Sequence, residues 1–228
     1  MPRARRLSGT LDVDGKRASW AREGPSARPL VFLAHGAGAP YTSPFMEAVA
    51  AGLVRRDLAS VRFHFPYMEE FVASGKRRPP NPQKTLLATW EAMLAKAATW
   101  KNLGPFVLAG KSMGGRMASM LLAQGRAPSA AVAAVYLGYP LHPPGRPEKL
   151  RSEHLSDVGV PQLFVSGSKD NLCKLELLRP VLRKLGSRAT LHVVEGGDHS
   201  LVVSRKEPMK GFDAWLDRVA EWVLKVAG

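Results

Sequence analysis

One short segment of the chain reads Phe106-Val107-Leu108-Ala109-Gly110-Lys111-Ser112-Met113-Gly114-Gly115. Its first four residues are apolar and predict a buried strand, and the Met- and Ala-rich run over 113–124 predicts a helix that ends at Gly125. Residues 110–114, between the two, match the pattern G-x-S-x-G. A serine on so tight a turn projects its hydroxyl from strained backbone, and larger side chains two residues away would collide there. We therefore predict a nucleophile turn with Ser112 at its tip.

The same residues also resemble the end of a phosphate-binding loop, G-x-x-x-x-G-K-S. That pattern needs glycine at position 105, where the chain has Pro105, and Gly104 lies one residue too early. It also needs flexible residues at 106–109, where the apolar run predicts a strand. We therefore set a nucleotide-hydrolase interpretation aside.

Short apolar runs of strand type alternate with helical runs along the chain, which indicates an α/β fold with a mostly parallel sheet and helices on both faces. The expected strands are 30–34, 60–65, 105–109, 130–137, 162–166 and 190–194, with one or two antiparallel edge strands over 8–14 and 17–22. The expected helices are 44–56, 83–100, 113–124, 172–185 and 211–226. Residues 68–82 predict a loop, and 139–160 a connection with at most a short helix, which leaves room for little or no cap domain. We expect one domain over residues 1–228.

A serine hydroxyl needs a neighbouring base before it becomes a good nucleophile. Of the six histidines, only His199 follows the last expected strand, in a loop that Gly196 and Gly197 allow to bend back over the sheet. A buried structural role is the alternative for this histidine. Asp170, in the loop after the preceding strand, is predicted to be the acid that orients the base, or else the N-cap of the next helix. Asp198 is a weaker candidate because adjacent side chains point apart.

The loop after the strand over 30–34 is predicted to supply an oxyanion hole. The backbone N–H of Ala37 can face the serine because Gly36 leaves room for the substrate, and the N–H of Met113 opens the helix that follows the serine. Each such donor stabilises a developing oxyanion by on the order of 3 kcal/mol. The neighbouring His35 is predicted to be a structural hydrogen-bonding residue. Lys111 either adds positive potential near the oxyanion or faces solvent, and both interpretations stay open.

This order of motifs, with serine, acid and histidine at successive strand ends, resembles the α/β-hydrolase superfamily across residues 30–228. The loop around His35 and the segment 110–115 look most like small dienelactone-hydrolase-like members. Four segments are also similar to uncharacterised predicted hydrolases related to the hydrolase-like domain of testis-expressed and nonspecific-lethal-complex-subunit proteins. They are Ala34-His35-Gly36-Ala37-Gly38-Ala39-Pro40, Ser43-Pro44-Phe45-Met46, Phe65-Pro66-Tyr67-Met68 and Gly75-Lys76-Arg77-Arg78-Pro79-Pro80. The resemblance implies a hydrolase without a cofactor. Dienelactone hydrolases themselves carry cysteine at the nucleophile position, so their activity does not carry over to Ser112.

The chain carries a formal net charge of +14, from 33 Lys and Arg against 19 Asp and Glu. Such a charge attracts anions in general. The basic residues are spread along the chain, which argues against nucleic-acid binding as the main function. The loop over 76–78 is expected near the active-site edge of the sheet, where Arg77 and Arg78 are candidate ligands for a carboxylate or phosphate of the substrate. A solvated basic turn is the alternative.

Cys173 is the only cysteine of the chain, which excludes an intramolecular disulfide and a Cys-rich metal site. We expect it to pack against the core. No run of eighteen apolar residues occurs, which argues against a membrane span. The basic amino terminus has no apolar segment behind it, which argues against a secretory signal. We therefore expect a cytoplasmic protein with no cofactor and no metal.

The favoured hypothesis is a serine hydrolase that cleaves an ester, thioester or amide bond of a small-molecule acyl substrate, anionic or neutral, through an acyl-serine intermediate. A non-catalytic interaction module of the same fold is the alternative from another class, and a serine peptidase is a third. Retention of Ser112, Asp170 and His199 counts against the module, because a scaffold has no need of all three. The sequence indicates neither the identity of the substrate nor the oligomeric state.

Overall fold

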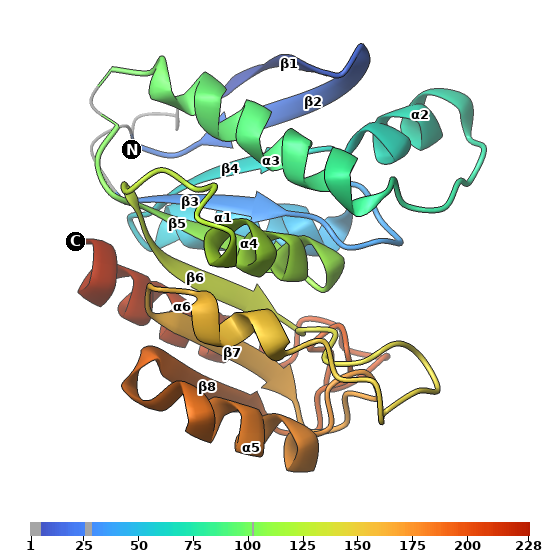
Figure 1. Cartoon of the computed structure of the whole chain (residues 1–228), viewed down its shortest axis with the longest axis vertical. Helices are drawn as coiled ribbons and strands as arrows, with labels where there is room; N and C mark the ends of the chain where they lie inside the picture. Colours follow the sequence, from blue (N-terminus) through green and yellow to red (C-terminus); the bar gives the residue numbers. More distant parts are fainter. Residues whose placement is uncertain (1–5, 26–28, 102) are drawn as a thin grey trace.

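The computed structural model describes residues 6–25, 29–101 and 103–228, and these residues form one eight-stranded sheet. The strands are β1 (Leu7–Val13), β2 (Lys16–Glu23), β3 (Leu30–Ala34), β4 (Ala59–Phe63), β5 (Phe106–Lys111), β6 (Ala131–Leu137), β7 (Gln162–Gly167) and β8 (Ala189–Val194). They lie in the order β1-β2-β4-β3-β5-β6-β7-β8 (Figure 1). Strands β3 to β8 are parallel, whereas β1 and β2 add an antiparallel edge. This is the mostly parallel sheet that the sequence predicts.

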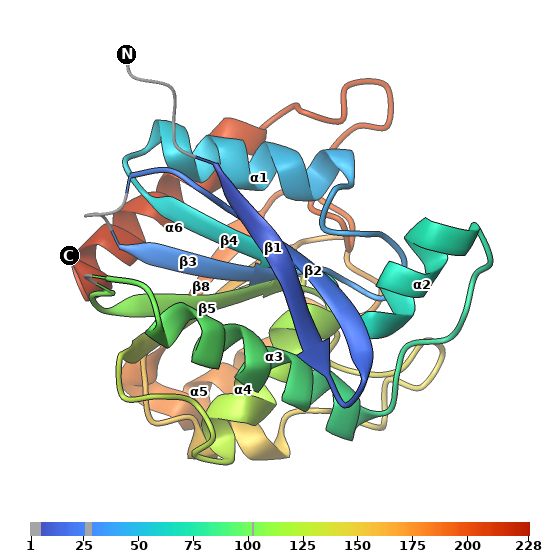
Figure 2. The ribbon, with the colours of Figure 1, turned by 90° about the horizontal axis from the view of Figure 1, so that it is seen from above.

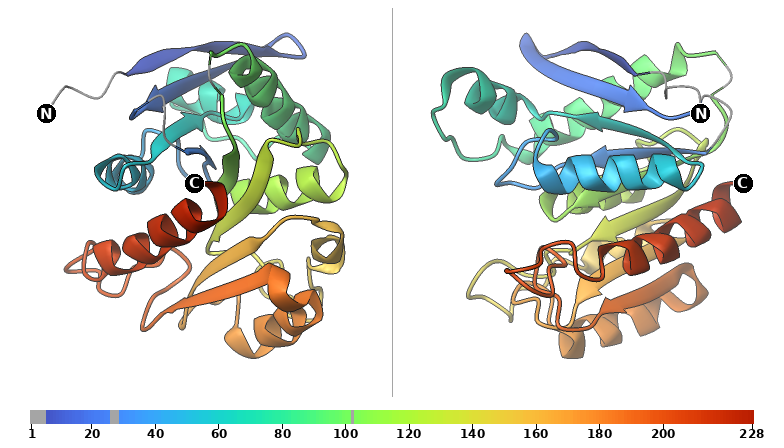
Figure 3. Two further views of the ribbon diagram at one scale, coloured as in Figure 1. Left: turned by 90° about the vertical axis from the view of Figure 1, so that its left-hand side faces the viewer. Right: turned by 180° about the vertical axis from the view of Figure 1, so that it is seen from behind.

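Helices cover both faces of the sheet. One face carries α1 (Pro44–Arg55) and α6 (Phe212–Ala227), and the other carries α3 (Gln83–Ala98), α4 (Met113–Ala123) and α5 (Leu175–Leu185) (Figure 2). Seen from behind, α1 and α6 lie across the same face (Figure 3). Two short 3-10 helices, η1 (Glu153–Asp157) and η2 (Gly186–Arg188), and a further helix, α2 (Pro66–Ser74), complete the set within the described ranges. Among these residues no helix is both long and apolar enough to cross a membrane.

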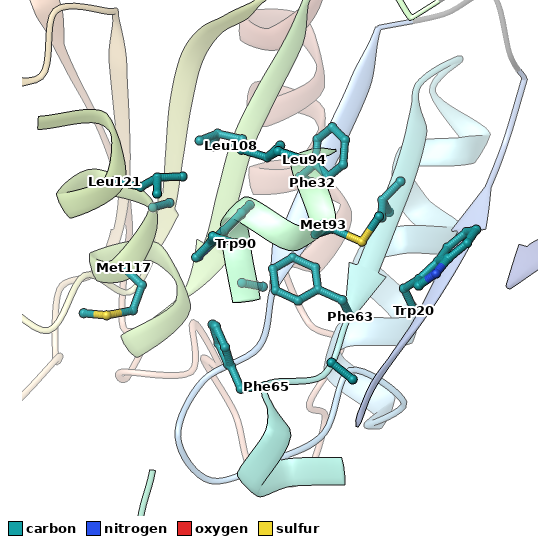
Figure 4. Close-up of a cluster of buried hydrophobic side chains, with 14 of the residues drawn as sticks. Trp20, Phe32, Phe63, Phe65, Trp90, Met93, Leu94, Leu108, Met117 and Leu121 are labelled. Atoms are coloured by element: carbon teal, nitrogen blue, oxygen red, sulfur yellow. The ribbon is translucent and has the colours of Figure 1, made fainter. Parts of the chain in front are cut away.

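The sheet is held by a separate apolar layer on each face. On the α3 and α4 side, the rings of Phe63 and Trp90 meet edge to face with centroids 4.9 Å apart, in a cluster that Figure 4 shows. On the other side, Trp215 of α6 packs in the layer that α1 and α6 form against the sheet. Every residue of β3 is buried, because this central strand has helices above and below it. The two layers therefore hold the central strands from both sides.

One expectation about local structure is wrong. Residues 68–82 were expected to form a loop, but α2 (Pro66–Ser74) occupies the first part of this segment. Pro66 stands at the first helical position, where its fixed φ favours a helix and its missing N–H costs nothing. The helix ends after nine residues at Gly75, whose φ of 70° is left-handed. Only the residues after Gly75 are irregular.

The remaining elements follow the expected ranges, with shifts at their ends. The helix expected from residue 172 begins at Leu175, and the strand expected over 60–65 is β4 (Ala59–Phe63). The connection between β6 and β7 contains only η1, which confirms that this part of the chain builds no cap domain. Residues 1–5, where we expect no secretory signal, lie outside the described residues.

Candidate active site

The turn between β5 and α4 has the geometry that the sequence predicts. Ser112 has φ 49° and ψ −115°, in the left-handed half of φ that side chains other than glycine rarely adopt. A methyl group at Gly110 would collide with the backbone nitrogen of Gly115, and one at Gly114 would lie 2.6 Å from the carbonyl oxygen of Ala34. The turn is therefore as tight as a projecting serine requires.

Three predicted side chains meet at the carboxyl edge of the sheet. The hydroxyl of Ser112 lies 2.8 Å from Nε2 of His199. The Nδ1 atom of His199 lies 2.9 and 3.0 Å from the two carboxylate oxygens of Asp170. Because an ionised carboxylate only accepts hydrogen bonds, it places the imidazole proton on Nδ1 and leaves the lone pair of Nε2 toward the serine.

The Asp170 side chain is fully buried and serves two partners. Besides His199, its Oδ1 accepts a hydrogen bond of 2.8 Å from the backbone N–H of Leu172. Asp170 is not the N-cap of the following helix, because α5 begins later and Lys174 takes that place. Asp198 instead shapes its own loop, since its Oδ1 accepts the N–H groups of Ser200 and Val202 at 2.7 and 3.1 Å.

A cavity of about 390 Å³ opens beside Ser112. It is lined by Ala37, Pro80, Asn81, Gln83, Leu86, Ser112, Met113, Arg116, Met117, Pro140, Pro144, Arg151 and Leu172. The two predicted oxyanion donors, Ala37 and Met113, thus face the same space as the serine. Tyr67 of α2 donates its hydroxyl hydrogen toward the carbonyl oxygens of Ala37 at 3.0 Å and Gly36 at 3.3 Å, which holds this loop in place.

His35 has the structural role that the sequence predicts. Its Nδ1 donates to the carbonyl oxygen of Gly36 at 2.7 Å, and its Nε2 accepts the backbone N–H of Phe65 at 3.0 Å. One nitrogen must donate and the other must accept, so the ring is neutral. Burial lowers the pKa of His35 to about 3, in agreement with that tautomer. The ring therefore connects the predicted oxyanion loop, residues 35–38, to Phe65 at the start of α2.

Lys111 points into the protein, so the solvent-facing interpretation is wrong. Its Nζ donates a hydrogen bond of 2.7 Å to the backbone carbonyl oxygen of His199. Burial lowers the pKa of Lys111 to about 8, although the nearby charges of Asp170 and Asp198 act in the opposite direction. The lysine side chain thus ties the nucleophile turn to the loop that carries the histidine.

Arg77 and Arg78 lie near the oxyanion loop, but each already has a partner on α2. The guanidinium of Arg77 lies 5.6 Å from the ring centroid of Phe71, and Arg78 forms an ion pair of 3.2 Å with Glu70. Both arginines line a small cavity of about 40 Å³ that also reaches Ala37. Their role as substrate ligands stays a prediction.

Two other arginines, which the sequence analysis missed, line the larger cavity beside Ser112. Arg116 stands four residues after the serine on α4, and this spacing puts both on one helix face, a signal that the sequence does contain. Arg151 lies in the irregular connection after β6, where no periodicity predicts its position. Among the described residues, no group of three or more His, Cys, Asp and Glu side chains could hold a metal ion.

Comparison with known proteins identifies the family. A family model described as an alpha/beta hydrolase domain matches residues 27–227. Dienelactone hydrolase from Anabaena variabilis superposes with a TM-score of 0.78 at 20% identity, over 99% of this chain and 100% of that one. A cold-adapted esterase from an Arctic intertidal metagenomic library superposes with a TM-score of 0.68 at 22% identity, over 96% of this chain and 95% of that one. A serine hydrolase homologue from Coxiella burnetii gives 0.67 at 14% identity, over 96% of each chain. With a family model that matches most of its length, the chain belongs to the α/β-hydrolase domain family.

Proposed function

We propose that the protein is a serine hydrolase that cleaves an ester, thioester or amide bond of a small acyl compound through an acyl-serine intermediate. The observation that carries this proposal is the unbroken line of contacts from Asp170 through His199 to Ser112 at 2.9 and 2.8 Å. The esterase and the serine hydrolase homologue among the similar structures agree with it. A non-catalytic module would need none of these contacts.

In the first half of the reaction, the oxygen of Ser112 attacks the carbonyl carbon of the substrate while Nε2 of His199 takes the serine proton. The imidazolium that forms is stabilised by the buried carboxylate of Asp170. The negative charge on the carbonyl oxygen is held by the N–H groups of Ala37 and Met113, aided by the positive end of the α4 dipole. The tetrahedral intermediate then expels the leaving group, which takes the proton from His199.

In the second half, a water molecule attacks the acyl group on Ser112 and gives a proton to His199. Collapse of this second intermediate releases the carboxylic acid, and the proton returns to the serine oxygen. The connection between β6 and β7 forms no cap, so the leaving group has a path from the cavity. Such an open site favours small or exposed acyl groups over long buried chains.

A fluorophosphonate probe tests the proposal, because it reacts with serines that a neighbouring base activates. We expect stoichiometric labelling of the wild type and at least about a thousandfold slower labelling of Ser112→Ala. Ser187→Ala, which removes an exposed hydroxyl in η2, is the matched control and should label like the wild type. Folded wild-type protein that takes up no probe would contradict the proposal and favour the interaction module. A Ser112→Ala variant that labels normally would contradict it differently, because the reactive residue would then not be Ser112.

A further inference from the structure

The cavity beside Ser112 contains two positive charges and no negative one. Arg116 and Arg151 line it, and no Asp or Glu occurs among its lining residues in the described parts of the chain. The Nε atom of Arg116 is buried and has no hydrogen-bond partner, and no hydrogen bond or ion pair engages the guanidinium of either arginine within those parts. The cavity is thus lined by cations that the protein itself leaves unpaired.

Two other arginines with largely buried side chains are paired with carboxylates, whereas the buried Arg22 lies over the ring of Trp100, 4.8 Å from its centroid. Arg62 is paired with Glu23 at 2.8 Å, and Arg56 forms ion pairs with Asp213 and Asp217 at 2.9 and 2.6 Å. A buried charge without a partner is unfavourable, and two like charges side by side add to that cost. Burial lowers the pKa of Arg116, and the charge of Arg151 acts in the same direction, whereas Tyr139 acts in the opposite one. An anion bound at this place would offset that cost.

The backbones of both arginines are held in place by the surrounding structure. The backbone N–H of Arg151 donates to the carbonyl oxygen of Leu141 at 2.7 Å, and its carbonyl oxygen accepts the hydroxyl of the buried Tyr139 at 2.7 Å. Arg116 is fixed by α4, and its backbone N–H donates to the carbonyl oxygen of Ser112 at 3.0 Å. Long side chains on a helix lean toward its N-terminus, which directs Arg116 toward the serine.

We propose that Arg116 and Arg151 form an anion-binding subsite of the active-site cavity, so that the substrate is a short acyl compound that carries a carboxylate or phosphate a few bonds from its scissile carbonyl. The inference rests on the proposed function and names its substrate class. Ser112 and Arg116 are four residues apart, and about 6 Å of helix rise separates their backbones, so the anion and the scissile carbonyl are expected to bind close together. The cavity wall also contains the apolar side chains of Met113, Met117 and Leu172. These side chains would contact the part of the substrate that joins the anionic group to the scissile carbonyl.

Arginine suits this role because its planar guanidinium donates two parallel hydrogen bonds to a carboxylate or phosphate. The anion would satisfy the orphaned Nε–H of Arg116 and separate the two like charges. The net charge of +14 would also raise the local concentration of an anionic substrate.

Two esters with the same leaving group and chain length test the subsite. They are 4-nitrophenyl pentanoate, which is neutral, and mono-4-nitrophenyl glutarate, which ends in a carboxylate. We expect the ratio of kcat/KM, glutarate over pentanoate, to fall about 10- to 100-fold in Arg116→Met and in Arg151→Met. Arg116→Lys should retain part of the ratio, because it keeps the charge and loses the planar fork. Spontaneous hydrolysis is subtracted in each case.

Arg179→Met is the charge-matched control, since Arg179 is exposed on α5 and is not among the residues that line the cavity. It should leave the ratio within about twofold of the wild-type ratio, because it removes only a distant screened charge. A ratio that changes in neither Arg116→Met nor Arg151→Met, while both esters are cleaved, overturns the subsite and leaves the proposed function standing. Failure of the proposed function is a different result: wild-type protein cleaves neither ester, or Ser112→Ala cleaves both normally.

Free anions separate carboxylate from phosphate and need no turnover. Glutarate and inorganic phosphate are each titrated into folded Ser112→Ala protein, and binding is followed by calorimetry. Saturable binding of glutarate, of phosphate or of both that is lost in Ser112→Ala/Arg151→Met supports the subsite and identifies its anion. Absence of binding for both anions, or binding that the arginine substitution does not weaken, overturns it.

Discussion

At the scale of single residues, Lys111 connects two parts of the candidate site that are far apart in the chain. Its backbone belongs to the nucleophile turn, and its ammonium group donates to the carbonyl oxygen of His199, 88 residues away. This contact fixes the backbone from which the imidazole projects. In the proposed mechanism, Lys111 is therefore a positioning residue that would act on the reaction through His199.

Replacement of Lys111 by Met should change how stability depends on pH. Burial lowers the pKa of this lysine from 10.5 to about 8, so between these values the unfolded chain holds a proton that the native protein has released. The free energy of unfolding then rises with pH, because the penalty for the buried charge is present below pH 8 and is relieved as pH approaches 10.5. Urea denaturation measures the free energy of unfolding of both proteins at pH 7 and pH 9.5. From the lower to the higher pH, the value for the wild type should rise relative to the value for Lys111→Met. A difference that stays constant or shrinks would show that the native pKa is not lowered.

The sequence predicts a site residue well when its role depends on its neighbours along the chain. It predicts poorly those residues whose positions depend on distant loops. Ser112 and its flanking glycines are recognisable because the tight turn depends on neighbours within two residues. His199 and Asp170 follow from their places after successive strands. The direction of Lys111 and the position of Arg151 depend on partners in other loops, so no spacing along the chain predicts them.

At the scale of elements, the nucleophile turn depends on close backbone contact between β5, β3 and α4. The Gly110 backbone lies against Gly114 and Gly115, and Gly114 lies against the carbonyl groups at the end of β3. This contact brings the start of α4 next to the oxyanion loop. The element that supplies the serine and the element that supplies the Ala37 N–H are therefore held as one unit.

Gly110→Ala should destabilise the protein by about 3 kcal/mol, because the added methyl group meets backbone atoms that have no room to move. It should also abolish fluorophosphonate labelling in whatever fraction folds. Gly104→Ala is the matched control, since a methyl group there meets nothing within 4 Å, and its effect should stay within about 0.5 kcal/mol. Urea denaturation of the three proteins measures both values. Equal stability of Gly110→Ala and wild type would mean that the turn is looser than described.

Helix α2 shows where reasoning from local composition fails. The residues that follow its first turn include charges, glycine and prolines, which are typical of loops. Pro66 also follows the expected strand over 60–65, where a proline indicates that the strand ends. The same proline favours the first turn of a helix, and the short helix is stabilised by burial of Pro66, Tyr67 and Met68. Because Tyr67 holds the oxyanion loop through Ala37, the missed helix is part of the candidate site.

At the scale of the whole molecule, the parallel sheet brings the site together. Strands β3, β5, β7 and β8 end at one edge, and the loops after them carry Ala37, Ser112, Asp170 and His199. The alternation of strands and helices in the sequence predicts this sheet, and the rule that parallel strands end together predicts the meeting of the loops. The residues that line the cavity are less predictable from the sequence, because they come from several separate segments. These segments are the loop after α2, helices α3 and α4, and the connection after β6.

An acyl group on Ser112 is the intermediate on which the proposed mechanism depends, and it can be trapped. The protein is mixed with 4-nitrophenyl acetate, quenched in acid within milliseconds and digested, and the peptide that contains Ser112 is weighed by mass spectrometry. We predict the mass of one acetyl group on Ser112, formed together with a burst of nitrophenolate equal to the enzyme present, and neither signal in Ser112→Ala. Turnover without this adduct, or an acetyl group carried by Lys111 or Cys173 instead, would contradict the account.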